Sequence, residues 1–182
     1  METVLTYAKD LDQERVSAQD DPMENKTLRF GILTASDRSA SGQRPDLSGP
    51  ALAEIVRSHG WQVVREQVLP DDRVQLADGL AAWADAGDLD VILVTGGTGF
   101  APRDVTPEAT RQVIDREAPG LAEAMRAASL RVTPHAMLSR AVTGMRGRVL
   151  IIDLPGSPKA AVENLQVVLP VLGHAVELLR ED

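Results

Sequence analysis

The 182-residue sequence has no cysteine, few aromatic side chains and a minority of basic residues. Without cysteine it can form no disulfide, thiolate metal site or cysteine nucleophile, which fits a reducing compartment. Its 19 Lys and Arg stand against 27 Asp and Glu, a net charge of −8, and its aromatic rings are two Trp, two Phe and one Tyr. Binding of nucleic acid needs phosphate-neutralising cations or stacking rings, so we expect no nucleic-acid partner.

Membrane and export segments are missing as well. No apolar run approaches the ~20 residues of a membrane span, and the first residues, METVLTYAKD, lack the basic start and apolar centre of a signal peptide. The composition, 43% apolar and 25% charged, is that of an ordinary globular protein. We expect a cytoplasmic protein that binds no membrane and has one domain large enough to bury its own core.

Residues 1–26 differ from the rest in charge. Their seven acids and three bases give a net charge of −4, half of the total of −8. Polarity without sustained apolar periodicity predicts a flexible acidic arm, which is either a solvated tail or a binding segment for a partner. Residues 27–182 are then the folded domain.

From residue 28 onward, segments typical of strands and of helices alternate. Apolar runs predict strands at residues 28–35, 61–69 and 89–95, and residues 139–154 predict two strands joined by a turn. Helical spacing of apolar residues predicts helices over residues 49–60, 72–87, 107–117, 121–130 and 158–179. This alternation predicts an α/β fold with three layers, α/β/α, around a mostly parallel sheet.

Individual residues mark the ends of these helices. Gly60 is expected just beyond a helix C-terminus. Asp71 and Thr106 are expected as N-terminal caps, with Pro107 in the first turn after Thr106. Pro170 lies inside the last predicted helix and should kink it, because proline has no backbone N–H.

The loop at residues 95–110, TGGTGFAPRDVTPEAT, follows the most apolar predicted strand. Its glycines allow positive φ and let backbone N–H groups approach an anion, and its first two threonines add hydroxyls. Asp104 is an acid where phosphate is expected, so a divalent cation, Mg²⁺, should lie between them. The alternative is a tight turn in which Asp104 only caps or pairs with Arg103. The loop is neither a Walker A sequence nor GxGxxG.

A second loop, at residues 154–165, leads into the last predicted helix. A helix N-terminus attracts anions through its free N–H groups and its dipole. Lys159 has the wrong sign for that dipole, so it is either held there for an anionic ligand or incidental to a well-capped helix.

Six short motifs follow one another along the chain: TASD (34–37), SGP (48–50), LPDD (69–72), TGGTGFAPRDVTPEAT (95–110), PHAMLSRAVTGMRG (134–147) and LPGSPKA (154–160). In order and spacing they resemble the molybdopterin adenylyltransferases, the G-domain enzymes of molybdenum-cofactor assembly that also occur fused in proteins such as gephyrin. The likeness covers residues 27–180 and leaves out the acidic arm.

The resemblance implies the fold of a molybdopterin-binding domain and transfer of AMP from Mg-ATP to the terminal phosphate of molybdopterin, with release of pyrophosphate. It implies Mg²⁺ as cofactor, ATP and molybdopterin as substrates, a homotrimer, and other molybdenum-cofactor assembly proteins as candidate partners. Phosphoryl transfer depends on positioning, a metal and charge neutralisation, which the two loops suit.

The resemblance also implies site residues by position. Asp71 and Asp104 would be the catalytic acids and Mg²⁺ ligands; Asp72 is an alternative to Asp71, which alignment on Pro70 favours. Nucleotide phosphate would bind at Thr95, Gly96, Gly97, Thr98, Gly99, Pro155, Gly156, Ser157 and Lys159. Molybdopterin would bind at Ser36, Asp37, Ser48, Gly49, Ser139 and Arg140.

Two further functions stay open at this point. The chain could bind a pterin or nucleotide without turnover, as an inactive paralogue or scaffold would, or it could hydrolyse the pyrophosphate bond of a dinucleotide or a sugar nucleotide. Two acids at a phosphate site favour the transferase, because a pure binding protein has no use for them.

Overall fold

The computed structural model describes residues 27–181, and the acidic arm expected at residues 1–26 lies outside them. The described residues form one sheet in the strand order β2–β1–β3–β6–β5–β4. Its strands are β1 (Arg29–Ala35), β2 (Gln62–Leu69), β3 (Val91–Thr95), β4 (Arg116–Glu117), β5 (Thr143–Arg146) and β6 (Val149–Leu154). The first four strands in that order run parallel to one another. At one edge of the sheet β5 pairs antiparallel with β6, and β4 pairs antiparallel with β5.

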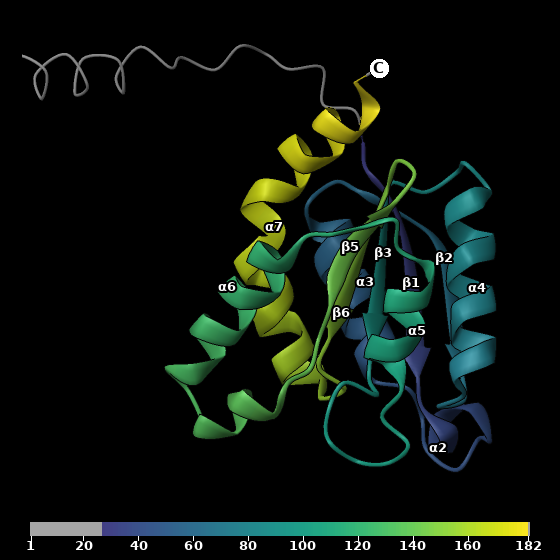
Figure 1. The fold of residues 1–182 in the computed structure, drawn as a ribbon, viewed down its shortest axis with the longest axis vertical. Coiled ribbons are helices and arrows are strands. Elements are labelled where there is room, and N and C mark those ends of the chain that lie inside the picture. The colour runs from purple at the N-terminus through teal and green to yellow at the C-terminus, as the bar shows by residue number, and fades with distance from the viewer. Residues whose placement is uncertain (1–26, 182) are drawn as a thin grey trace, which may run out of the picture.

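Helices cover both faces of the sheet (Figure 1). They are α2 (Asp37–Ala40), α3 (Ser48–Ser58), α4 (Arg73–Asp85), α5 (Thr106–Val113), α6 (Pro119–Leu130) and α7 (Pro158–Arg180), with the short 3-10 helix η1 (Pro134–Leu138). α3, α6 and α7 pack on one face, and α4 and α5 on the other. Neighbouring residues of a strand face opposite ways, so Ile92 and Leu93 enter different cores. The predicted three-layer α/β fold is confirmed.

The helix predicted at residues 107–117 differs from α5 at both ends. Val105 occupies the N-cap position, and Thr106, the predicted cap, is the first helical residue. The Thr106 hydroxyl is buried and donates to the Gly96 carbonyl at 2.8 Å, so it fixes the preceding loop instead. The helix ends at Val113 because the two residues of β4 pair with β5, a partner that local periodicity cannot reveal.

α7 runs without a break through Pro170, which is exposed. By length and composition alone this 23-residue helix could cross a membrane. In the fold, however, one side of α7 is buried in the core, including Leu165, Leu172 and Val176. The apolar content of α7 is therefore explained by its packing against α3, α6 and the sheet.

A fully buried acid, Asp153, lies near the end of β6. Its carboxylate accepts a hydrogen bond from the Thr110 hydroxyl at 2.7 Å and another from the Val142 N–H at 3.1 Å. Burial raises the pKa of Asp153 to about 7, against the lowering effect of these two hydrogen bonds. The acid thus joins α5 and the entry to β5 to the central sheet.

Asp153 should make stability fall as pH rises. Between pH 4 and 7 the folded chain keeps the Asp153 proton and the unfolded chain does not, so the free energy of unfolding decreases with pH over that window. Asp153→Asn removes the ionisation, and its amide can accept from the Val142 N–H through oxygen and donate to the Thr110 hydroxyl through nitrogen. It should therefore be the more stable protein at pH 8, by about 4 kcal/mol. Chemical denaturation of both proteins at pH 4.5 and 8 tests this, and equal pH slopes would contradict it.

Candidate functional site

A cavity of about 460 Å³ opens at the sheet edge where the parallel strands end. Segments far apart in sequence form its walls: the chain after β1, the glycine-rich loop after β3 and the loop before α7. Its lining includes these predicted site residues: Ser36, Asp37, Ser48, Asp71, Thr95, Gly96, Gly97, Asp104 and Gly156. This edge is where α/β folds of this kind bind ligands.

The glycine-rich loop needs glycine at two positions. Gly96 and Gly97 have φ values of +100° and +62°. A Cβ on Gly96 would lie 2.3 Å from the Ala35 carbonyl oxygen, and one on Gly97 would lie 2.5 Å from the Thr106 hydroxyl. The backbone of the loop is therefore pressed against β1 and α5, and no side chain separates it from a ligand in the cavity.

Two hydroxyls attach the loop before α7 to the other walls. Thr95 donates to the Pro155 carbonyl at 2.7 Å, and Ser48 donates to the Gly156 carbonyl at 2.9 Å. Both residues were predicted to contact substrate. The structure gives each a bond that shapes the cavity, and the hydroxyl oxygen retains its capacity to accept.

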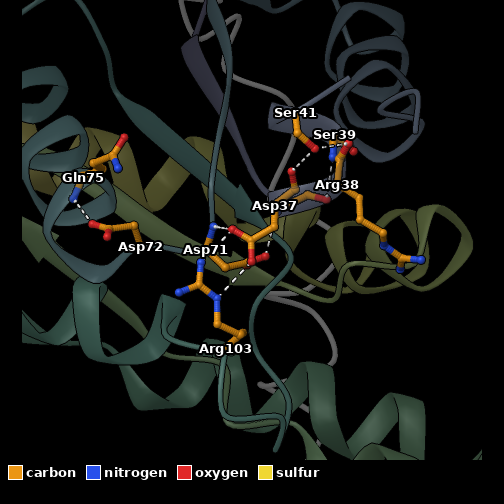
Figure 2. A network of polar contacts seen from close by, with 9 residues as sticks. Asp37, Arg38, Ser39, Ser41, Asp71, Asp72, Gln75 and Arg103 are labelled. Carbon is orange, nitrogen blue, oxygen red and sulfur yellow. Dashed lines mark hydrogen bonds and ion pairs between the residues drawn. The ribbon is translucent and has the colours of Figure 1, made fainter. Parts of the chain in front are cut away.

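Asp37, the first residue of α2, and Asp71, between β2 and α4, bond reciprocally. The Asp37 N–H donates to the Asp71 carboxylate at 2.9 Å, and the Asp71 N–H donates to the Asp37 carboxylate at 3.0 Å. Arg103 donates twice to Asp37, at 2.9 and 2.7 Å (Figure 2). The hydrogen bond from Arg103 holds the pKa of Asp37 below its ordinary value. Arg103 therefore pairs with Asp37 and not with Asp104, the alternative that the sequence left open.

The structure separates the roles of the two adjacent acids, Asp71 and Asp72. Asp72, not the predicted Asp71, caps α4 by accepting from the Gln75 N–H at 2.9 Å. Figure 2 shows Asp72 turned toward α4 while Asp71 points to Asp37. Burial raises the pKa of Asp71, and the carboxylates of Asp37 and Asp104 raise it further, although the Asp37 N–H lowers it. A proton or a cation near Asp71 would relieve this repulsion.

Asp104 has a bond inside its own loop. Its carboxylate accepts from the Ala101 N–H at 2.8 Å, and its N–H donates back to the Ala101 carbonyl, also at 2.8 Å. A Cβ on Gly99 would lie 2.8 Å from this carboxylate, so the glycine leaves room for it. Asp104 closes a tight turn and lines the cavity at once.

The predicted molybdopterin residues do not all come together. Ser139 lies in a second cavity of about 280 Å³, with Thr98, Gly99 and Pro155. Most of that cavity lies between α6, η1 and the start of α7, and its polar groups include Ser129 and Asn164. The Arg140 side chain lies outside both cavities and points to the glycine-rich loop and Glu108.

Three other predicted site residues, Lys159, Ser157 and Gly49, are not among those that line the first cavity. Lys159 is exposed and pairs with Glu163 at 3.8 Å. Ser157 occupies the N-cap position of α7 without a side-chain cap bond. Gly49 lies behind the wall, where a Cβ would meet Asp46 at 2.5 Å.

Among the residues that line the first cavity and were not predicted as site residues, three are charged: Arg38, Arg44 and Asp46. Asp46 accepts from the Thr34 hydroxyl at 2.8 Å and from the Ser48 N–H at 3.0 Å, so it orders the start of α3. Its place two residues before Ser48 was the available signal. The two arginines gave no such signal, and Figure 2 shows Arg38 pointing away from Asp71.

Residues 31–174 match the family model described as a probable molybdopterin binding domain. Among curated proteins, the Helicobacter pylori (strain J99) molybdopterin adenylyltransferase is 39% identical over 156 residues, 85% of this chain and 89% of its own length. The Drosophila melanogaster molybdenum cofactor synthesis protein cinnamon is 42% identical over 86% of this chain. The chain spans only 26% of the length of cinnamon.

A solved structure shares the fold. The molybdopterin biosynthesis enzyme MoaB from Thermus thermophilus is 52% identical, with a TM-score of 0.80. The match covers 84% of this chain and 96% of that structure.

Proposed function

The chain belongs to the family of probable molybdopterin binding domains, and we propose that it is a molybdopterin adenylyltransferase. In this reaction an oxygen of the terminal phosphate of molybdopterin attacks the α-phosphorus of ATP. A new P–O bond forms, the bond from the α-phosphorus to the oxygen bridging to the β-phosphorus breaks, and pyrophosphate leaves. The attacking phosphate is largely ionised near neutral pH, so the step needs no general base.

One observation carries the proposal: two aspartates from separate loops, Asp71 and Asp104, line the same cavity as Gly96 and Gly97. The glycine backbone suits phosphate oxygens. Two acids beside it would repel a polyphosphate unless a cation came with the nucleotide. This combination fits transfer from a metal-bound nucleotide better than it fits storage of a pterin.

Asp71 and Asp104 would hold Mg²⁺ together with the nucleotide. Within residues 27–181 no three His, Cys, Asp or Glu side chains are grouped to hold a metal ion alone. Mg²⁺ commonly uses one or two carboxylates and completes its shell with phosphates and water, so two acids suffice. When bound, the ion would neutralise charge on the phosphate oxygens. Burial raises the pKa of Asp71 and its two neighbouring carboxylates raise it further, so a bound cation would favour the ionised form of this acid.

Other residues of the two cavities would orient the substrates. Arg38 and Arg44 line the first cavity and could pair with the departing pyrophosphate. The second cavity, with Ser139 and the Asn164 amide, has the mixed apolar and polar wall that a planar heterocycle needs. Thr98 and Gly99 line the second cavity, so the loop whose Gly96 and Gly97 line the first cavity continues directly into the second.

Adenylyl transfer to purified molybdopterin tests the proposal. We expect pyrophosphate to be released in equal amount to adenylylated molybdopterin, and only when ATP and Mg²⁺ are both present. Binding of both substrates without pyrophosphate release would establish the non-catalytic alternative instead.

We further propose that the protein acts as a cytoplasmic homotrimer, as the motif resemblance implies. Exposed apolar side chains around η1, Val132, Met137 and Leu138, offer surface that a subunit contact could cover. Light scattering at micromolar concentration should give about three times the chain mass of 19.5 kDa. A mass of one chain would contradict the trimer.

A further inference from the structure

Arg140 donates hydrogen bonds to the glycine-rich loop through its backbone N–H and its guanidinium. Its backbone N–H donates to the Thr98 carbonyl at 2.9 Å. Its guanidinium donates through Nε to the Gly99 carbonyl and through Nη2 to the Asp104 carbonyl, both at 2.6 Å. Gly99 and Asp104 lie at the two ends of a short loop segment, and the Arg140 guanidinium bridges their carbonyl groups.

Glu108, in the first turn of α5, fixes the orientation of that planar group. It accepts from Arg140 Nη1 at 2.5 Å, and the two side chains are about one-third exposed, at 32% and 38%. Partial burial opposes ionisation of Glu108, but the hydrogen bond from Arg140 leaves its pKa below the ordinary value. The ion pair is therefore formed throughout the neutral range and directs the remaining donors at the loop.

We propose that Arg140 and Glu108 form a clamp that positions Asp104 at the cavity, so that Arg140 is a positioning residue and not a ligand of molybdopterin. The kinetic part of this inference rests on the proposed function; the ordering of the loop does not. Among residues 27–181, the hydrogen bond to the Asp104 carboxylate comes from the Ala101 N–H in the same turn. Its place in the cavity thus depends on what holds the turn as a whole.

Lysine cannot replace arginine in this clamp. The guanidinium presents its donors in a rigid fork that reaches two carbonyls and a carboxylate at once. An ammonium keeps the charge and can pair with Glu108, but it cannot bridge Gly99 and Asp104 in the same geometry. Arg140→Lys therefore separates the bridging role from the charge.

Arg140→Lys, Glu108→Gln and the double variant test the clamp by amide hydrogen exchange and by steady-state kinetics. Exchange of residues 98–104 should accelerate by roughly 10-fold or more in Arg140→Lys, and kcat should fall by roughly 10-fold or more. The KM for molybdopterin should stay within about 2-fold, since the clamp is not a binding group. Glu108→Gln should act in the same direction, and the double variant should add little, because both changes open one clamp.

Arg111→Lys is the matched control. Arg111 lies on the same helix and pairs with the exposed Glu117 at 3.6 Å, away from the loop. It should change neither exchange nor kinetics.

Unchanged exchange of residues 98–104 in Arg140→Lys would overturn the clamp. So would a raised KM for molybdopterin with unchanged kcat, which would make Arg140 a substrate ligand. If the parent protein shows no adenylyl transfer, the proposed function fails while the exchange measurement still decides the clamp. If Arg140→Lys does not fold, Glu108→Gln supplies the same comparison.

Discussion

Asp71→Asn should lower the rate of pyrophosphate release by roughly 10²-fold or more, the size of effect seen when one preorganised electrostatic group is lost. The amide oxygen of Asn can still accept from the Asp37 N–H, so the join between the two loops persists. The substitution also removes a charge beside Asp37 and Asp104. The melting temperature should therefore hold or rise while turnover is lost, and both are measured on one preparation.

Asp72→Ala is the neighbouring control with the opposite expectation. It removes the α4 cap that accepts from the Gln75 N–H, which should cost about 1 kcal/mol of stability. Activity per folded molecule should stay within about 2-fold. If Asp72→Ala lost turnover and Asp71→Asn kept it, the inward acid would have been misassigned.

Asp104→Asn should also lower turnover by roughly 10²-fold or more. Asn preserves an acceptor for the Ala101 N–H, so the turn should remain closed and the melting temperature nearly unchanged. Affinity for molybdopterin should change little, because the Ser139 cavity is lined by other residues. Pyrophosphate release, thermal unfolding and molybdopterin titration distinguish these effects.

The control for Asp104 is another loop aspartate with one comparable bond. Asp115 is exposed and accepts from the Gly147 N–H at 2.7 Å, at the β5–β6 turn. Asp115→Asn should leave turnover intact. Near-normal turnover in a destabilised Asp104→Asn protein would show that Asp104 only closes its turn.

The layered fold could be predicted because its signals are local. Apolar runs give the parallel strands, and Gly60, with φ of +76° just beyond α3, ends that helix where the sequence predicted. The pairing of β4 with β5 was not predictable, since two polar residues at 116–117 become a strand only through a partner near residue 145.

The site was predictable in its residue types and less so in its contacts. The glycine-rich loop and Asp104 could be predicted as site residues because a carboxylate beside a phosphate-binding glycine loop requires a cation between them. Whether Asp71 or Asp72 points into the cavity depends on the direction of the backbone between the end of β2 and the start of α4. Two identical residues in succession give no sequence signal that distinguishes them. Arg103 bonds to Asp37, 66 residues away, and Arg140 bonds to Asp104, 36 residues away. Patterns over a few neighbouring residues cannot predict such pairs.

The reciprocal bonds between Asp37 and Asp71 have a mechanical consequence. The start of α2 and the segment before α4 cannot move apart without breaking both bonds, so they form one continuous wall of the cavity. A ligand entering the cavity meets backbone that is already ordered, and little chain entropy remains to be lost on binding. Ligands that require the two segments to separate must break both hydrogen bonds, so we expect them to bind more weakly than ligands that fit the wall as it stands.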